Sequence, residues 1–458
     1  MWIAIETFFL IYFVFYHGMS LLLHILSFYQ LEKQPLSPPI KNRVAPSVNI
    51  LIPAYNEENN IVDCILSALN VDYPQFHVTI IDDGSSDGTI EKLKQTFNLT
   101  LTTLASPSIT KLETAEILSV YSSKTIPHLN VLSKKNGGKA DALNAGVNLL
   151  DTELVCCIDA DTLIEKQSLW HLVHAYLINP EENIAIGGSV RIGNSGIIRD
   201  GTLIQSHLPR NILACTQVLE YLKAFLIGRV GWSQMNSLLI ISGAFGLFNK
   251  KVLVEAGGYQ PHLMGEDMEL ILRLHKKFKK NKAKYRILHV PASICWTEAP
   301  QAFSQLQKQR IRWQRGILES LTRNWHLCFS GGVVGWIGYP FFFIFEGLDP
   351  LIEAFGYIFL IMELIYGHVA WDRMGGFLYC TLAVGLFMTL LSLLVEEVYF
   401  KTYHRWRHII FLSVVCFFEL CFYRKIIFLW RLQGTLLWLF ARKSDWGHLK
   451  RKGWQTMS

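Results

Sequence analysis

The sequence contains little charge for its length and shows no organised pattern of cysteines. Charged residues make up only 17% of the 458 residues, whereas hydrophobic residues make up 51%. Soluble domains carry about 25% charged residues, so this deficit indicates membrane segments. The nine cysteines are odd in number and form no CxxC pair, so neither a disulfide framework nor a zinc site is indicated, and a reduced cytosolic environment fits. The net charge of +6 suits cytoplasmic membrane flanks better than nucleic acid, so no nucleic-acid partner is expected.

The first thirty residues lack the features of a cleaved signal peptide. Residues 3–29 are long and apolar enough to cross a bilayer, yet neither a basic n-region nor a small-residue cleavage site is present. We therefore expect residues 1–30 to form an uncleaved transmembrane anchor. The basic residues that follow are Lys33, Lys41 and Arg43. They place the downstream domain in the cytoplasm.

The C-terminal third of the chain is almost wholly apolar. Residues 376–395 carry no charge and form the clearest span of the chain. The runs at 409–423 and 426–440 are short and fit one bent span, a re-entrant pair or interfacial helices. We expect interfacial and transmembrane helices over 326–440, with two to four crossings, and a basic cytoplasmic tail over 441–458. These features predict a multi-pass protein of the plasma or inner membrane.

Residues 45–325 show the pattern of an α/β domain. The expected strands cover residues 47–55, 77–83, 128–134, 154–159, 184–191, 237–248 and 285–296. The expected helices cover residues 58–69, 87–97, 138–149, 167–178 and 266–279. The alternation predicts a mainly parallel sheet with flanking helices, in which ligands bind at the carboxyl ends of the strands. The Ser/Thr-rich residues 100–125 are expected to form a surface loop.

Polar residues follow the first two expected strands. The first strand ends in Pro53-Ala54-Tyr55-Asn56-Glu57, and the second in Asp82-Asp83-Gly84-Ser85. Carboxylates at a strand end can accept hydrogen bonds from a nucleobase N–H and from ribose hydroxyls. An Asp/Gly/Ser turn before a helix explains the second segment equally well. Both readings stay open on the residues alone.

A glycine pair and a lysine open the helix expected at 138–149. Gly137 and Gly138 leave backbone N–H groups free for a phosphate, and Lys139 adds a positive charge. The spacing does not match a Walker motif. A glycine turn with a solvated lysine is the alternative.

Asp159-Ala160-Asp161 follows the apolar run Leu154–Ile158. On a strand, residues two apart point to the same side, so both carboxylates would face one ligand. Two adjacent carboxylates repel unless a cation lies between them. Mg²⁺ and Mn²⁺ favour such oxygen ligands. The alternative is a solvated strand end in which Asp161 caps the next turn.

Gly265-Glu266-Asp267 opens another expected helix. A carboxylate here could act as a general base toward a substrate hydroxyl within hydrogen-bond reach; if such a hydroxyl attacked an anomeric carbon, one carboxylate would suffice for inversion. A glycoside hydrolase would use two carboxylates and water. An acidic pair favoured by the helix dipole is the alternative.

The pentad Gln309-Arg310-Ile311-Arg312-Trp313 lies on a helix expected over 303–320. Its basic residues fit an amphipathic helix on anionic lipid. Gln309 and Trp313 are four residues apart and share a face, where the indole can stack on a sugar.

Together these motifs resemble the membrane-bound, GT-A, family 2 processive glycosyltransferases, which include cellulose, hyaluronan and poly-N-acetylglucosamine synthases. The resemblance implies that Ala54 and Glu57 line a uridine pocket and that Asp83 holds the uracil. It implies that Lys139 contacts the diphosphate, Asp159 and Asp161 hold Mg²⁺ or Mn²⁺, and Asp267 is the general base supported by Glu266. The implied substrate-binding residues of the pentad are Gln309, Arg310, Arg312 and Trp313. The segment Ser242–Phe248 resembles the family's acceptor site, although a buried strand fits it equally well, and Arg191 would line the same cleft or form a surface ion pair.

The resemblance implies a membrane-embedded, inverting, metal-dependent transferase that adds a hexose or N-acetylhexosamine from a UDP-sugar to a growing polysaccharide, processively. Its partners would be the UDP-sugar donor, a glycan or glycolipid acceptor and membrane lipid. Because the membrane region is short, an accessory subunit or a dimer is a further expectation. The alternatives are a glycolipid-forming transferase that adds a single sugar, and an inactive membrane scaffold, for which no damaged motif is found.

Overall fold

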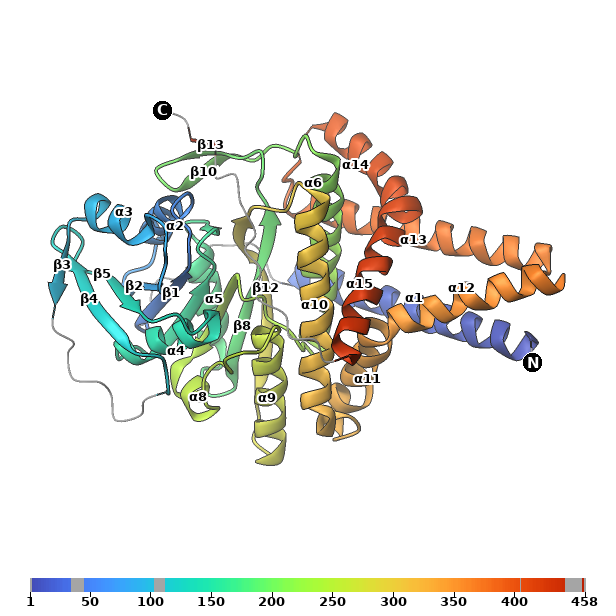
Figure 1. Ribbon diagram of the computed structural model, residues 1–458, viewed down its shortest axis with the longest axis horizontal. Coiled ribbons are helices and arrows are strands. Elements are labelled where there is room, and N and C mark those ends of the chain that lie inside the picture. Colours follow the sequence, from blue (N-terminus) through green and yellow to red (C-terminus); the bar gives the residue numbers. More distant parts are fainter. Residues whose placement is uncertain (1, 34–44, 103–111, 404, 441–454, 457–458) are drawn as a thin grey trace. The chain divides into compact units, whose positions relative to one another are not determined.

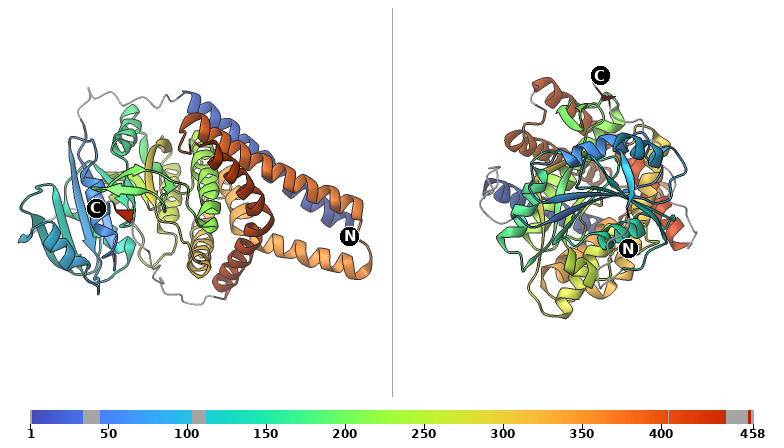
Figure 2. Two further views of the ribbon diagram at one scale, coloured as in Figure 1. Left: turned by 90° about the horizontal axis from the view of Figure 1, so that it is seen from above. Right: turned by 90° about the vertical axis from the view of Figure 1, so that its left-hand side faces the viewer.

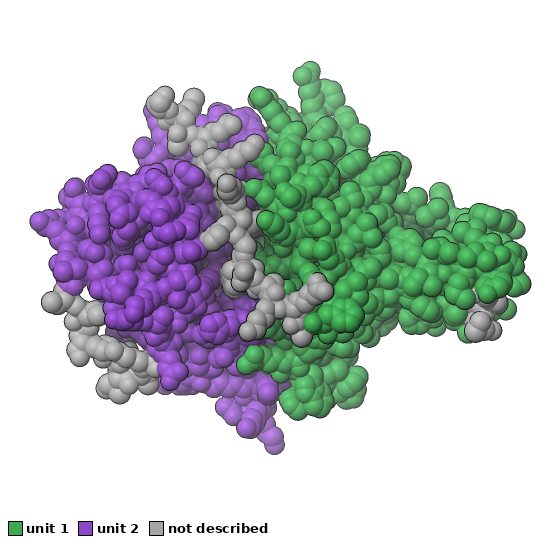
Figure 3. All heavy atoms as spheres, in the orientation of Figure 1, with its two compact units in different colours: residues 1–35, 208–237, 300–449 green, residues 36–207, 238–299, 450–458 purple. Residues whose placement is uncertain are grey.

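The computed structural model describes residues 2–33, 45–102, 112–403, 405–440, 455 and 456. Lys41, Arg43 and nearly all of the expected basic tail lie outside these residues. The chain divides into two compact units, which Figure 3 colours separately. Unit 1 comprises residues 1–35, 208–237 and 300–449, and unit 2 comprises residues 36–207, 238–299 and 450–458.

Unit 2 is built on a large mixed sheet with strand order β3-β4-β5-β2-β1-β6-β11-β8-β12-β7 (Figure 1). Its strands are β1 (Val48–Ala54), β2 (Phe76–Asp82), β3 (Leu99–Thr102), β4 (Ile117–Ser123), β5 (Leu129–Lys134), β6 (Leu154–Ile158), β7 (Leu163–Ile164), β8 (Asn183–Ile192), β11 (Phe245–Asn249) and β12 (Arg286–Thr297). The central strands β5, β2, β1 and β6 run parallel, as do β8 and β12. This arrangement confirms the predicted α/β class. A small second sheet contains β9 (Ile197–Arg199), β10 (Thr202–Gln205) and β13 (Gln455–Thr456).

Helices pack on the large sheet because its central strands are apolar on both faces. Every residue of β6 is buried. The helices of unit 2 are α2 (Ile61–Leu69), α3 (Thr89–Thr96), α4 (Lys139–Leu149), α5 (Ser168–Ile178), α8 (Lys250–Glu255) and α9 (Glu266–Lys280). Helix α4 packs on β1 and β2, and α5 packs on β8 and β12. Gly146 allows the close approach of α4, because a Cβ atom there would lie 2.9 Å from side-chain atoms of Ile81 and Leu51.

Two local predictions were wrong. The strand expected over 237–248 is confined to β11, because the chain from Ser237 to Ala244 runs as irregular backbone. The loop expected over 100–125 contains an antiparallel edge hairpin, β3 and β4. The side chains of β3 are only partly buried, so its sequence lacks the apolar pattern that marks the central strands.

Unit 1 is helical. Its elements are α1 (Trp2–Lys33), α6 (Ile212–Tyr221), η1 (Leu222–Gly228), α7 (Arg229–Gln234), α10 (Phe303–Arg323), η2 (Trp325–Leu327), η3 (Val334–Gly338), α11 (Tyr339–Phe342), η4 (Phe343–Gly347), α12 (Asp349–Tyr366), α13 (Trp371–Tyr399), α14 (Trp406–Phe418), η5 (Glu419–Tyr423) and α15 (Arg424–Leu439). Helices α1 and α13 lie side by side in both Figure 1 and Figure 2 and contact each other. Phe9 of α1 also stacks on Phe355 of α12.

Two helices of unit 1 are long and apolar enough to cross a membrane, judged by length and composition. They are Ile3–Lys33 and Trp371–Tyr399, and they contain the anchor and the clearest span predicted from the sequence. The runs at 409–423 and 426–440 belong to one continuous helical stretch. A π-helical turn, η5, joins α14 to α15 within it. The two runs are thus continuous, and their placement as one bent span, a re-entrant pair or interfacial helices stays a prediction.

Candidate active site

The predicted polar residues of unit 2 gather where neighbouring strands end. Ala54, Asp83 and Asp159 lie at or just beyond the carboxyl ends of β1, β2 and β6, and these three strands are adjacent in the sheet. Carboxyl ends of parallel strands are the usual ligand-binding edge of such a sheet. The same region receives the first turn of α4, at Lys139, and of α9, at Glu266. Five of the predicted site residues therefore converge within one unit.

Lys139 connects the two acidic motifs. Its Nζ lies 2.5 Å from Oδ1 of Asp159 and 3.7 Å from Oε1 of Glu266. Burial by itself would lower the pKa of Lys139, but the negative charges of Asp159 and Glu266 outweigh it and hold that pKa above its usual range. Lys139 therefore carries a fixed positive charge between two carboxylates, in a position where a phosphate group could replace one of them.

Gly243 brings the segment Ser242–Phe248 into this cluster. Its backbone N–H donates to Oδ2 of Asp267 at 3.3 Å. A Cβ atom at Gly243 would lie only 2.8 Å from Nζ of Lys139, so a residue with a side chain would force the lysine to shift. The main chain of this segment therefore lies between Lys139 and Asp267. The segment is irregular over Ser242–Ala244, whereas Phe245–Phe248 belong to the buried strand β11, so the strand alternative holds for its second half.

Glu266 and Asp267 occupy different environments on the first turn of α9. Asp267 is partly exposed, and its Oδ1 accepts the N–H of Met268 at 2.8 Å. Glu266 is 5% exposed. Burial raises the pKa of Glu266 to about 7, with Lys139 opposing the rise and Asp267 adding to it. Glu266 can therefore change protonation near neutral pH.

The strand-based argument for Asp159 and Asp161 was wrong. β6 ends at Ile158, and the next residues form a turn in which Thr162 N–H donates to the Asp159 carbonyl at 3.0 Å. The Asp161 side chain is buried and accepts the Thr297 hydroxyl at 3.4 Å. In the described part of the chain, no three His, Cys, Asp or Glu side chains are grouped closely enough to hold a metal ion by themselves. A metal here would need oxygen ligands from a substrate as well.

Asp83 is buried and fully engaged by groups that follow β5. Its Oδ1 accepts from Nζ of Lys134 at 2.6 Å and from Gly137 N–H at 3.0 Å, and its Oδ2 accepts from Gly138 N–H at 2.7 Å. Burial raises the pKa of the Asp83 carboxyl, and Lys134 and the glycine N–H groups oppose the rise. Asp83 therefore holds the turn that leads into Lys139, and the prediction that Gly137 and Gly138 leave their N–H groups free for a phosphate was wrong. Gly138 can form that turn because it adopts a φ of +88°.

Lys134 is a site residue that the sequence reasoning missed. Its side chain is fully buried, and its Nζ also lies 2.6 Å from Oδ1 of Asp141 on α4. Lys134 and Lys135 are adjacent and chemically identical, so composition cannot distinguish the buried lysine from the exposed one. Strand alternation does not distinguish them either, because both faces of β5 contain buried residues, and only the fold shows that Lys134 is buried.

The two loops predicted to form a base pocket are joined by hydrogen bonds. The Ala54 carbonyl accepts from Asp83 N–H at 2.9 Å, and Glu57 N–H donates to the Thr89 hydroxyl at 3.1 Å. Asn56, in the left-handed region, accepts Ser86 N–H at 2.8 Å. Ala54 is buried and Glu57 is partly exposed. Arg191, the other uncertain candidate of unit 2, lies with its guanidinium 5.8 Å from the ring centroid of Trp296.

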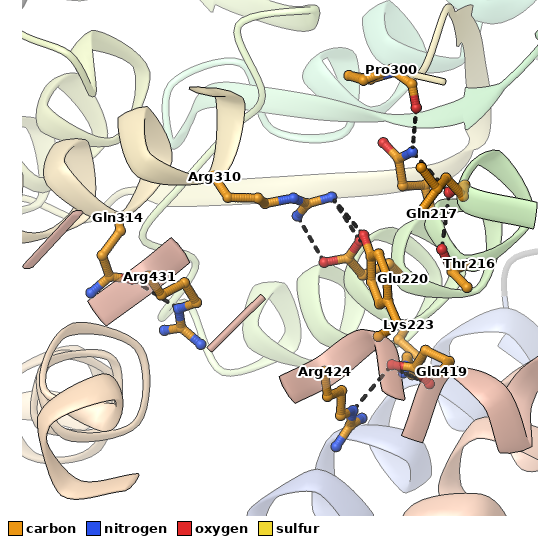
Figure 4. Close-up of polar contacts among 12 residues, drawn as sticks. Thr216, Gln217, Glu220, Lys223, Pro300, Arg310, Gln314, Glu419, Arg424 and Arg431 are labelled. Atoms are coloured by element: carbon orange, nitrogen blue, oxygen red, sulfur yellow. Dashed lines mark hydrogen bonds and ion pairs between the residues drawn. The ribbon is translucent and has the colours of Figure 1, made fainter. Parts of the chain in front are cut away.

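The pentad belongs to unit 1 and lies on α10. Arg310 is 5% exposed and forms two hydrogen bonds with Glu220, at 2.7 and 2.8 Å (Figure 4). The expectation of a basic face toward lipid was therefore wrong for Arg310, because its charge is directed into the unit. Trp313 is partly exposed, whereas Gln309 is buried, and its Oε1 has no hydrogen-bond partner among the residues that the structure describes.

Glu220 was also missed by the sequence reasoning. It lies on α6 within a stretch that is otherwise almost free of charge, Ile212–Gly228, where Lys223 is the other ionised residue. Buried charges are paired in proteins, so each of these residues signals a partner elsewhere in the chain. The sequence does not identify the partner, because Arg310 lies ninety residues away.

Two sequence models of one enzyme family match the chain. "Glycosyl transferase family 2" matches residues 49–105, and "Glycosyltransferase like family 2" matches residues 113–316. Together they cover more than half of the chain and include every strand of the large sheet.

Curated relatives agree with this match. The poly-beta-1,6-N-acetyl-D-glucosamine synthase of Staphylococcus epidermidis is 30% identical over 279 residues, which are 60% of this chain and 56% of the relative. The enzyme of the same name from Staphylococcus aureus (strain MSSA476) is 29% identical over 301 residues, or 65% and 60% of the two chains. The chain thus spans less than two thirds of the length of these relatives.

The fold is shared with a solved structure, the mannosyltransferase PcManGT from Pyrobaculum calidifontis in complex with GDP-Man and Mn2+. The TM-score is 0.57 at 16% identity, with 93% of this chain and 100% of the other covered. This likeness confirms a GT-A-like fold. With two family models matched along most of the sheet-bearing unit, and relatives of the same type, the chain belongs to the family 2 glycosyltransferases.

Proposed function

We propose that this chain is a membrane-embedded, inverting glycosyltransferase that transfers a hexose or N-acetylhexosamine from a UDP-sugar to a growing polysaccharide, processively. The observation that carries the proposal is the junction at Lys139. One lysine there contacts the aspartate of the Asp159-Ala160-Asp161 motif and the glutamate beside Asp267. A leaving diphosphate and an attacking hydroxyl require such a cation and such carboxylates close together.

The donor nucleotide would bind at the ends of β1 and β2. Ala54 and Glu57 would line the uridine pocket. Asp83 would act there through the glycine turn that it holds, because both of its oxygens already accept hydrogen bonds. The diphosphate would lie at the first turn of α4, where the positive end of the helix dipole and Lys139 attract anions.

A divalent metal, Mg²⁺ or Mn²⁺, fits the residues present. Asp159 and Asp161 offer only oxygen ligands, which these ions prefer. Mg²⁺ is commonly bound by one or two carboxylates together with substrate phosphates, so the lack of a three-residue cluster in the described chain does not conflict with the proposal. The metal would neutralise the charge that develops on the leaving UDP. The complex of PcManGT with Mn2+ and GDP-Man supports a metal at this kind of fold.

Asp267 is the proposed general base. It accepts the proton of the acceptor hydroxyl while that oxygen forms a bond to the anomeric carbon and the bond from this carbon to the diphosphate breaks. The result is inversion in one displacement. The Gly243 N–H, 3.3 Å from Oδ2, orients the carboxylate, and Glu266 supports it on the same helical turn.

The acceptor glycan or glycolipid would be handled by α10. Gln309, Arg312 and Trp313 are the proposed contacts, and the exposed indole of Trp313 suits stacking on a sugar ring. We also propose that residues 45–325 act in the cytoplasm and that 1–30 and the helices of 326–440 attach the enzyme to the plasma or inner membrane. Membrane lipid and an accessory subunit or second copy remain proposed partners.

The test uses membranes that contain the full chain, incubated with a panel of labelled UDP-sugars and with GDP-mannose, with Mn²⁺, Mg²⁺ or EDTA. We expect a long product from UDP-N-acetylglucosamine, because the relatives are named for such a polymer. The product should be degraded by a hydrolase specific for β-1,6-linked N-acetylglucosamine, and EDTA should abolish its formation. Asp267→Asn membranes serve as the matched negative control.

Each other outcome has a defined meaning. A single labelled sugar on an organic-extractable lipid would replace the polymerase proposal with the glycolipid-forming alternative. Transfer that is undiminished in EDTA would remove the metal. No transfer from any nucleotide sugar, with the protein confirmed to be folded by its thermal transition, would reject the catalytic proposal and favour the scaffold.

A further inference from the structure

The pentad residue Arg310 is held by a polar cluster, here called the Arg310 clamp, which consists of the buried Arg310 and Tyr423 and the partly exposed Glu220. The guanidinium donates to both carboxylate oxygens of Glu220, at 2.7 and 2.8 Å. The Tyr423 hydroxyl donates to Oε2 of Glu220 at 3.1 Å. Arg310 is 5% exposed, and Figure 4 shows its side chain extended toward the Glu220 carboxylate.

The clamp unites three segments that are far apart in sequence. Glu220 lies on α6, Arg310 on α10 and Tyr423 on η5. Apolar packing joins the same segments, since Leu213, Leu306 and Tyr423 form one buried cluster. An arginine fork bound to a carboxylate by two parallel hydrogen bonds is geometrically specific. The clamp therefore fixes the rotation of α10 about its own axis at the level of the pentad.

Arg310 also supports the residue proposed to contact sugar. Its guanidinium carbon lies 4.5 Å from the centroid of the Trp313 ring. The guanidinium thus contacts both the Glu220 carboxylate and the Trp313 indole, and an arginine held this way restricts the ring. Trp313 keeps 37% of its surface exposed, so one part of the indole stays open while the clamp supports another.

We propose that Glu220 is a positioning residue for acceptor binding, which acts through Arg310 to hold the Trp313 indole. This inference rests on the proposed function, because it assumes that Trp313 contacts the acceptor. It reassigns Arg310 from substrate contact to support, since the guanidinium is committed to Glu220 and Tyr423. It also gives a role to a residue that no motif of the sequence singled out.

The test compares Glu220→Gln with Glu419→Gln. Glu419 is the control, because it is a carboxylate of the same unit that pairs with Lys223 and Arg424 instead of with α10 (Figure 4). Its side chain is 2% exposed and that of Glu220 is 27% exposed, so a loss of packing should be at least as large in Glu419→Gln. In Glu220→Gln, an amide N–H₂ faces one guanidinium N–H, so one of the two parallel hydrogen bonds is lost. The measurements are kcat/KM for a supplied oligosaccharide acceptor and the Kd of UDP, on the full chain in detergent or nanodiscs.

We expect Glu220→Gln to lower kcat/KM for the acceptor by roughly 10²-fold, because small misplacements of a positioning group have effects of this size. The loss should lie mainly in the acceptor KM, and the Kd of UDP should stay within about twofold of wild type. Glu220→Asp, which keeps the charge, should recover part of the loss. Because Glu220 and Arg310 act as a unit, the double variant Glu220→Gln/Arg310→Gln should be no worse than either single variant.

Three results would overturn the inference. Equal acceptor defects in Glu220→Gln and Glu419→Gln would indicate a general loss of packing in unit 1. An unchanged acceptor KM in Glu220→Gln would show that the clamp does not position Trp313. Additive losses in the double variant would show that Arg310 acts independently of Glu220. If the wild-type protein transfers no sugar at all, the proposed function fails first, and the clamp proposal falls with it.

Discussion

The two adjacent lysines at the end of β5 allow a sharp test of how burial determines the value of an ion pair. Lys134 lies 2.6 Å from both Asp83 and Asp141, and its side chain is fully buried. Lys135 lies at the same distance, 2.6 Å, from Glu116, but both of these side chains are 65% exposed. The perturbations are Lys134→Met and Lys135→Met, which keep chain length and remove one charge each.

The structure sets very different magnitudes for the two changes. Removing one partner of a buried pair costs about 3–5 kcal/mol, because it leaves an uncompensated charge. Asp83 keeps the N–H groups of Gly137 and Gly138, and Asp141 keeps that of Ala115, so the cost should stay within this range. For a unit of this size, that corresponds to a fall of roughly 6–20 °C in Tm. Water and salt screen an exposed pair, so Lys135→Met should lower Tm far less than Lys134→Met.

The assay is differential scanning calorimetry of the full chain in detergent, with both variants and the wild type at one pH and salt concentration. Raising the salt concentration should reduce the small effect of Lys135→Met and leave the effect of Lys134→Met in place, because salt screens exposed charges most. Equal shifts in Tm for the two variants would refute the reasoning. So would a Lys134→Met protein as stable as wild type.

Three further predictions concern the proposed chemistry. Asp267→Asn should bind UDP normally and lose about 10²–10⁴-fold in transfer rate, as measured by isothermal titration and product release, and near-normal turnover would remove Asp267 from the base role. Trp313→Ala should impair extension of a supplied acceptor while the Kd of UDP is unchanged, and the reverse pattern would refute acceptor contact at the pentad. Because burial raises the pKa of Glu266 from its ordinary 4.5 to about 7, the metal-free protein should lose stability as pH rises between these values. Glu266→Gln should remove that part of the pH dependence of Tm, and an unchanged profile would contradict the shift.

Much of unit 2 was predictable because local patterns specify it. The apolar run of β6 predicts a strand, and the glycine pair followed by a lysine predicts the start of α4. The bounds of both elements in the structure differ from the predicted bounds by one residue at most. The prediction of a strand before β11 failed because the apolar residues of that segment pack without pairing with a neighbouring strand. Their composition alone suggested a strand. The strand-based prediction for Asp159 and Asp161 failed because β6 ends at Ile158. The alternation of side chains along a strand therefore does not apply to these two residues.

The polar pairings were not predictable, because each joins segments distant in sequence. From the sequence, Arg310 was predicted to be a surface charge. Only the fold shows that it forms an ion pair with Glu220. Lys134 read like its neighbour Lys135, although the two differ completely in exposure. A charge in an apolar stretch indicates that a partner exists, but the identity of the partner is a property of the tertiary structure.

The close packing at Gly146 has a consequence for how fast and how tightly a donor could bind. Because α4 lies directly against Ile81 and Leu51, its first turn moves with the sheet and not as an independent arm. An anion that arrives at Lys139 would meet donors already in place, and binding would lose little entropy in ordering them. The donor end of this enzyme would therefore act as a rigid receptor. Any slow, adaptive step in the cycle would have to occur where the growing acceptor is held.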